Sequence, residues 1–204
     1  MQVPTEDEFR EGFQTFRTHE ERDAMYKVAT YLLEDFWGQP ADMADGLGVL
    51  LLTWNQSFYR TQSFNFAELE DFLDSHFDRL NEYRERNIDS FSDSDIPDIE
   101  NIFNELLNAT RLQSGSREGY RSPVGVAKGL HLLAPKFFPL WDKRIAEAYG
   151  YSTLSKNNPS DYIEFCWDMK QFAYQIEDYD NPENKSVLKL IDEYNYSKYT
   201  QGWI

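Results

Sequence analysis

Apolar residues recur every three or four positions along most of this chain, the spacing that places them on one face of a helix. Between Pro40 and Trp54 they cover more than one face, which predicts a buried central helix. No stretch alternates between apolar and polar residues for long enough to predict a strand, so we expect an all-α fold. The clearest early stripes are Phe9, Phe13 and Phe16, followed by Met25, Val28, Ala29, Leu32 and Phe36.

Capping residues and prolines indicate where the later helices begin. Asn65 and Glu68 have the spacing of a capping box, in which each side chain bonds to a backbone N–H of the first turn. Pro97 suits the first turn of the next helix, and the polar run at 87–95 before it predicts an exposed connection. Two further prolines, Pro159 and Pro182, precede the last two apolar stripes.

Length and composition favour one domain that covers residues 1–204. The 204 residues are 41% hydrophobic, which is enough to bury a substantial core despite a formal net charge of −16. Two lobes of this domain would meet at a cleft between residues 45–60 and 122–150. No apolar run is long enough to span a bilayer and the first residues lack a signal peptide, so we expect a cytoplasmic protein without a membrane partner.

The chain offers few ligands for a metal ion. Its single cysteine, Cys166, excludes a disulfide within the chain and any four-cysteine metal site. The histidines His19, His76 and His131 are far apart in sequence and lack the spacing of zinc ligands. We therefore expect no metal site and no cofactor.

Charge is distributed unevenly along the chain. Residues 1–110 contain 8 basic and 24 acidic side chains, whereas residues 111–144 contain 7 basic and only 2 acidic ones, Glu118 and Asp142. The overall acidity argues against loose binding to nucleic acid, because that affinity depends on neutralising phosphates. The basic segment nevertheless predicts a local site for an anionic ligand.

The basic segment contains the most informative motif, at residues 122–150. Pro123 fits the first turn of a short apolar helix, and Gly125 within it permits close approach by another group. Two prolines then bracket an extended connection. Asp142 follows at the position of an N-cap, and Gly150 ends the helix that Asp142 begins.

This combination of a glycine-containing turn, a helix with a lysine, a short linker and an acid that opens a helix resembles the helix-hairpin-helix DNA glycosylase superfamily. The resemblance is best over residues 122–150. It implies an all-α, two-lobed fold in which a hairpin grips the DNA backbone and a flipped base enters the cleft. It also implies removal of a damaged or modified base by hydrolysis of the N-glycosidic bond, as in DNA repair, with no cofactor.

The resemblance assigns roles to individual residues. Asp142 corresponds to the essential acid and Lys128 to the nucleophile of bifunctional members. The end of the early central helix would supply the base pocket, with Trp54, Asn55 and Gln56. The groups that would contact the DNA backbone are Arg121, Gly125, Lys143 and Arg144.

Other interpretations of the same residues remain open. Asp142 is equally a structural N-cap, and Lys128 on an apolar helix is more often a surface lysine whose stem alone is buried. Trp54 then simply ends a core helix. On this basis the chain is a noncatalytic, acidic helical module on a glycosylase-like scaffold, which binds a protein partner instead of DNA.

Overall fold

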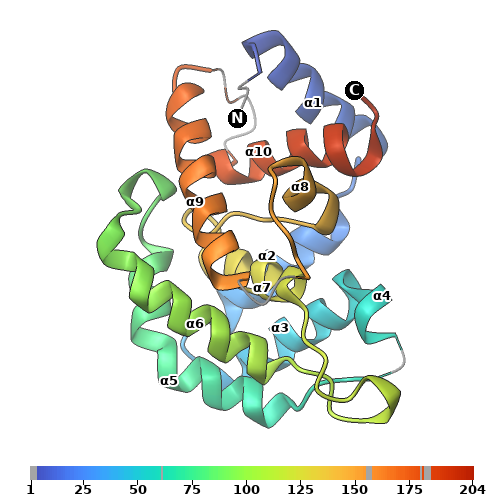
Figure 1. The fold of residues 1–204 in the computed structure, drawn as a ribbon, viewed down its shortest axis with the longest axis vertical. Helices are drawn as coiled ribbons and strands as arrows, with labels where there is room; N and C mark the ends of the chain where they lie inside the picture. Colours follow the sequence, from blue (N-terminus) through green and yellow to red (C-terminus); the bar gives the residue numbers. More distant parts are fainter. Residues whose placement is uncertain (1–3, 61, 155–157, 180, 182–184) are drawn as a thin grey trace.

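The computed structural model describes residues 4–60, 62–154, 158–179, 181 and 185–204. Every regular element within these residues is helical, which confirms the predicted all-α class (Figure 1). The α-helices are α1 (Glu6–His19), α2 (Ala24–Asp35), α3 (Pro40–Trp54), α4 (Gln56–Tyr59), α5 (Phe66–Arg84), α6 (Ile96–Ala109), α7 (Pro123–Leu133), α8 (Lys143–Ala148), α9 (Asn158–Gln175) and α10 (Val187–Asn195). The shorter elements are the 3₁₀ turns η1 (Ile88–Ser90), η2 (Asp93–Asp95) and η3 (Gly115–Arg117) and the π-helical turn η4 (Tyr196–Gln201).

The helices pack in two groups around one continuous core. Helix α3 contacts α2, α5 and α7, and α6 packs on α5 and α7. At the other end of the molecule α1 contacts α10 and η4, and η4 also contacts α8 (Figure 1). Helix α9 touches both groups through α6 and α10, and buried residues from both groups belong to one cluster.

Helix α2 buries only part of the stripe that its sequence predicts. Met25 and Val28 are 43% and 53% exposed, whereas Ala29 and Leu33 are fully buried. Both faces of this helix carry apolar residues, and its packing against α3 and α7 selects the face with Ala29 and Leu33. The predicted stripe is therefore wrong at Met25 and Val28 and right at Ala29.

The capping prediction for α5 is half right. The Asn65 side chain accepts a hydrogen bond from the backbone N–H of Ala67 at 3.0 Å, as an N-cap does. Glu68 does not complete the box, because its carboxylate forms an ion pair with Arg111 at 2.6 Å.

Pro97 lies in the first turn of α6 as predicted. Pro182 lies outside the described residues, and Ser186 caps the beginning of α10.

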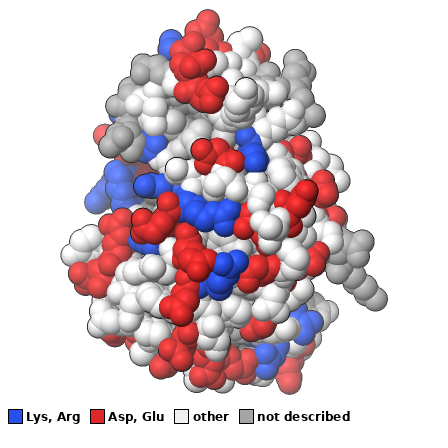
Figure 2. Space-filling model, turned by 90° about the vertical axis from the view of Figure 1, so that its left-hand side faces the viewer, with Lys and Arg blue, Asp and Glu red and all other residues white. Residues whose placement is uncertain are grey.

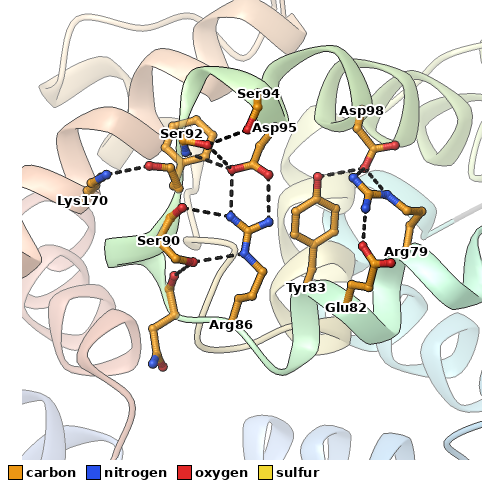
Figure 3. A network of polar contacts seen from close by, with 12 residues as sticks. Arg79, Glu82, Tyr83, Arg86, Ser90, Ser92, Ser94, Asp95, Asp98 and Lys170 are labelled. Atoms are coloured by element: carbon orange, nitrogen blue, oxygen red, sulfur yellow. Dashed lines mark hydrogen bonds and ion pairs between the residues drawn. The ribbon is translucent and has the colours of Figure 1, made fainter.

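The polar segment 87–95 is tied to the core, unlike the exposed connection that its sequence predicts. Asp95 is 5% exposed and accepts two hydrogen bonds from the guanidinium of Arg86, at 2.7 and 2.8 Å (Figure 3). Arg86 also donates to the carbonyl of Ser90 at 2.9 Å, and its guanidinium lies 4.5 Å from the ring centroid of Phe137. Burial acts to raise the pKa of Asp95, but the ion pair with Arg86 lowers it.

A second set of contacts extends this polar network. Tyr83 and Arg79 both donate to the Asp98 carboxylate, at 2.8 and 3.0 Å, and Lys170 of α9 donates to the carbonyl of Phe91 at 2.6 Å (Figure 3). Figure 2, which views the molecule from the left-hand side of Figure 1, shows Lys and Arg side chains gathered across the middle of this face with Asp and Glu side chains around them. Cations and anions are therefore closely interspersed here.

Replacing Arg86 with Met will lower the free energy of unfolding by about 3 kcal/mol, because Asp95 is left as a buried carboxylate without its ion pair. Arg10→Met is the matched control, since Arg10 pairs with Glu6 on the exposed face of α1 and such a pair contributes about 0–1 kcal/mol. Urea unfolding of both variants near neutral pH measures the difference. Equal effects would contradict the structural role of Arg86.

Candidate active site

The beginning of α7 is joined to the end of α3 by a chain of hydrogen bonds. Ser122 caps α7, because its Oγ accepts from the backbone N–H of Gly125 at 3.0 Å. The same Oγ accepts from Nδ2 of Asn55 at 2.9 Å. A Cβ at Gly125 would lie 3.2 Å from the Asn55 amide, so only glycine fits without displacing it. Asn55 and Gly125 therefore fix the position of α7, and both are buried.

Asp142 is the N-cap of α8, as its sequence context predicts. Its Oδ1 accepts from the backbone N–H of Ile145 at 2.8 Å, and its Oδ2 accepts from the hydroxyl of Thr200 at 2.6 Å. Because both oxygens act as acceptors, the group is bound as a carboxylate. The capping bond anchors it on the helix backbone, and Thr200 of η4 sets the orientation of its second oxygen.

Lys128 of α7 points toward Trp54 instead of extending into solvent. Its Nζ donates to the carbonyl of Trp54 at 2.8 Å and lies 5.0 Å from the centroid of the Trp54 ring. Burial lowers the pKa of Lys128 to about 8, although Asp142 and Asp192 act in the opposite direction. The interpretation of Lys128 as a lysine that reaches the surface does not fit this geometry.

Lys128 and Asp142 line a common cavity of about 260 Å³, which we call the aromatic cavity. This volume lies just below the range of about 300–1,000 Å³ that is typical of ligand pockets. Its aromatic walls are Phe16, Trp54, Trp141 and Tyr196. Its charged lining consists of Glu20, Asp23, Lys128, Asp142, Lys189 and Asp192.

An outer groove of about 550 Å³ shares Trp54, Lys128 and Asp142 with the aromatic cavity. Its rim is basic, and the exposed side chains of Arg121, Lys143 and Arg144 are part of it, together with Arg117. Several of these cations have weak or local partners. Lys143 pairs with Glu147 at 3.7 Å, Arg144 donates to the carbonyl of Thr200, and Arg117 donates to the carbonyl of Phe58.

A buried cluster of charges contributes Asp23, Lys189 and Asp192 to one wall of the aromatic cavity. The Lys189 side chain is 3% exposed, and its ammonium lies 3.1 Å from Asp23, 3.4 Å from Glu193 and 3.6 Å from Asp192. We call these four residues the Lys189 cluster. Burial acts to lower the pKa of Lys189, but the three carboxylates raise it. Burial raises the pKa of Asp192 to about 6; Lys189 acts to lower it, whereas Glu193, Asp142 and Asp23 act to raise it.

The structure brings together some of the predicted site residues and separates others. Trp54, Lys128 and Asp142 line both cavities, and Arg121, Lys143 and Arg144 line the outer groove. Asn55 lines the outer groove, but its amide donates to Ser122. Gln56 is exposed and belongs to neither lining, so it does not join the other pocket candidates.

The wall of the aromatic cavity that is formed by residues near the two ends of the chain was not predicted from the sequence. Asp23 precedes α2, while Lys189 and Asp192 lie on α10. The available signal was the spacing of Lys189, Asp192 and Glu193, three charged residues at i, i+3 and i+4 on a helix with buried Leu188. The same spacing is typical of an exposed helix face, so it does not distinguish the two situations.

Comparison with protein-family models, with curated proteins and with solved structures finds no match for this chain. Among the described residues, no three His, Cys, Asp or Glu side chains are placed to hold a metal ion. No helix in the described parts of the chain has the length and hydropathy needed to cross a lipid bilayer.

Replacing Lys128 with Met will raise the free energy of unfolding near neutral pH by up to about 3 kcal/mol, because Met fills similar space without a buried charge. The pKa of Lys128 is lower in the folded protein, so the unfolded chain binds more protons and the wild type gains stability as pH rises from about 8 to 10.5. The advantage of the variant will therefore shrink across that range. Urea unfolding at several pH values measures the difference in the free energy of unfolding between the variant and the wild type. A difference that does not depend on pH would contradict the lowered pKa of Lys128.

Proposed function

We propose that this protein removes a base from a nucleic acid by hydrolysing the N-glycosidic bond, as a DNA glycosylase does. The observation that carries the proposal is the position of Asp142. A carboxylate anchored at a helix N-terminus lines an aromatic cavity, and that cavity shares its lining with a groove that has a basic rim. A flipped base requires a stacking pocket, and the DNA backbone requires cations beside it.

The chemistry assigns different roles to the two central residues. Cleavage of the N-glycosidic bond places oxocarbenium character on the sugar, and a carboxylate close to that carbon stabilises the charge and orients a water molecule. Asp142 has this role in the proposal. A pKa of about 8 leaves Lys128 mostly protonated near neutral pH, so we assign it to an electrostatic role beside Asp142 and assign the attack on the sugar to water.

The proposal extends to the arrangement of the fold. The two helix groups would be the lobes of a glycosylase-like domain, with α2, α3, α5, α6 and α7 in one and α1, α8, α10 and η4 in the other. The aromatic cavity takes lining residues from both groups, since Trp54 and Lys128 belong to the first and Phe16 and Asp192 to the second. A base that enters from the outer groove would then lie between the lobes, against the ring of Trp54.

One specific observation favours the alternative of a noncatalytic module that binds a protein partner. Both oxygens of Asp142 already have donors, Ile145 and Thr200, which is what a purely structural cap requires. In the catalytic proposal the Thr200 hydroxyl orients the carboxylate. In the alternative it completes the cap, and the large acidic surface binds the partner. The two proposals differ in what they predict for a variant that lacks the Asp142 charge, since only the catalytic proposal predicts a loss of base release.

Replacing Asp142 with Asn will abolish base release and change the free energy of unfolding by less than about 0.5 kcal/mol, because Asn is an equally good N-cap. The assay measures release from duplexes that contain uracil, hypoxanthine, 8-oxoguanine or 7-methylguanine. Glu147→Gln is the matched control, since it removes an exposed carboxylate from the same helix. If the wild type releases no base from any duplex, the noncatalytic alternative holds.

Replacing Arg121 with Ala will weaken binding to duplex DNA and lower the salt slope of the binding constant by about one, because one phosphate contact is lost. Lys27→Ala removes an exposed cation of α2 that lies outside both cavity linings, so it will leave the slope unchanged. Fluorescence anisotropy between about 50 and 200 mM salt measures the slopes. An identical slope for the wild type and Arg121→Ala would remove Arg121 from the interface.

A further inference from the structure

Asp192 is a cavity carboxyl group with few bonds of its own. It lies on α10, its side chain is 13% exposed, and it lines the aromatic cavity with Lys128 and Asp142. Among the described residues, the polar contact found for it is the ion pair with Lys189 at 3.6 Å. Asp142, in contrast, accepts hydrogen bonds at 2.8 and 2.6 Å. The Asp192 carboxyl is therefore available to a molecule bound in the cavity.

The charges of the Lys189 cluster do not balance. Asp23, Asp192 and Glu193 share the ammonium group of Lys189, and Lys185 adds a second cation 2.8 Å from Glu193. Three carboxyl groups beside two ammonium groups favour one carboxyl group that remains a neutral acid in this buried setting. We assign the neutral form to Asp192, because Asp23 lies closer to the Lys189 ammonium, at 3.1 Å, and Glu193 has Lys185 as a second cation at 2.8 Å.

We infer that Asp192 donates a proton to the departing base, an inference that rests on the proposed base release. Asp142 would stabilise the sugar cation while Asp192, on α10 of the same helix group, protonates the base that Trp54 stacks against. Two acidic groups with different protonation states in one site are the arrangement that glycosidic cleavage uses. The negative charges of the Lys189 cluster then keep Asp192 in its neutral form.

The step balances in atoms and electrons. The C1′–N bond breaks and its electron pair moves to the base, and a ring nitrogen or exocyclic oxygen of the base takes the proton of the Asp192 carboxylic acid. Water forms the new bond to C1′ and loses its proton to solvent, and the Asp192 carboxylate takes a proton back from solvent. The products are the free base and a sugar with a hydroxyl group at C1′, and water is the co-substrate.

The protonation of Asp192 sets the expected pH dependence. Burial raises the pKa of Asp192 to about 6, so the acid form is lost and base release falls as the pH rises through that value. Asp142 and Lys128 face Asp192 from outside its own helix, and Lys128 stays protonated over most of this range. The other titratable groups around it are Asp23, Tyr26, Lys189, Glu193 and Tyr196.

The experiment compares single-turnover base release by the wild type, Asp192→Asn and Asp23→Asn across a pH series from acid to weakly alkaline. The substrates are the uracil, hypoxanthine and 8-oxoguanine duplexes, whose bases leave as neutral molecules only with a proton. Asp192→Asn will slow release by about 10²–10⁴-fold and remove the decline with pH. Asp23→Asn changes the charge of the same cluster equally, but it will keep the decline and move it to lower pH, because Asp23 raises the pKa of Asp192.

The outcomes separate the role of Asp192 from the proposed function. Release by Asp192→Asn at the wild-type rate with the same decline overturns the role of Asp192 and leaves the proposed function in place. A wild type that releases no base overturns both. If Asp192→Asn does not fold, the wild-type profile decides, because a rate that stays constant or rises with pH through the range around 6 overturns the inference.

Discussion

The burial of the Lys189 ammonium is the constraint on which the candidate site depends. A charge that is 3% exposed is stable only when opposite charges surround it, and Asp23, Asp192 and Glu193 do so. Asp23 begins α2 whereas the other two acids lie on α10, so these ion pairs hold distant parts of the chain together. The ring of Phe16, 4.8 Å from the ammonium, completes the enclosure. The contacts that neutralise Lys189 thus also fix one wall of the aromatic cavity.

The sequence predicts most of the helices because an apolar stripe of helical spacing depends on local composition alone. Which face of a helix is buried depends on its neighbours, and α2 shows the limit, with Val28 exposed and Leu33 buried. Asp95 shows the same limit for charge. A carboxylate in a polar run is expected in solvent, but Arg86 reaches it nine residues away while its guanidinium packs on Phe137. These outcomes are set by tertiary packing.

The candidate site could be predicted mainly on the side that a contiguous motif encodes. Asp142 is identifiable as an N-cap because its helix follows directly, and Lys128 belongs to the same segment. The amide of Asn55 could not be assigned from sequence, because its partner Ser122 is 67 residues away. The second acid, Asp192, is also distant from Asp142 in sequence, on a helix whose charged residues resemble those of an exposed face. The side of the site that α10 forms therefore cannot be predicted from local sequence patterns.

The hydrogen bond from Thr200 to Asp142 links the site to the order in which the chain assembles. The bond spans 58 residues, and Ser197 of the same turn donates to the carbonyl of Gly12, 185 residues away. Contacts of such large sequence separation carry a high loop-closure entropy and tend to form late. The helical core can thus collapse before the carboxylate is oriented. A partly folded chain would carry every site residue and still lack the geometry, so this arrangement restricts the site to the fully assembled molecule.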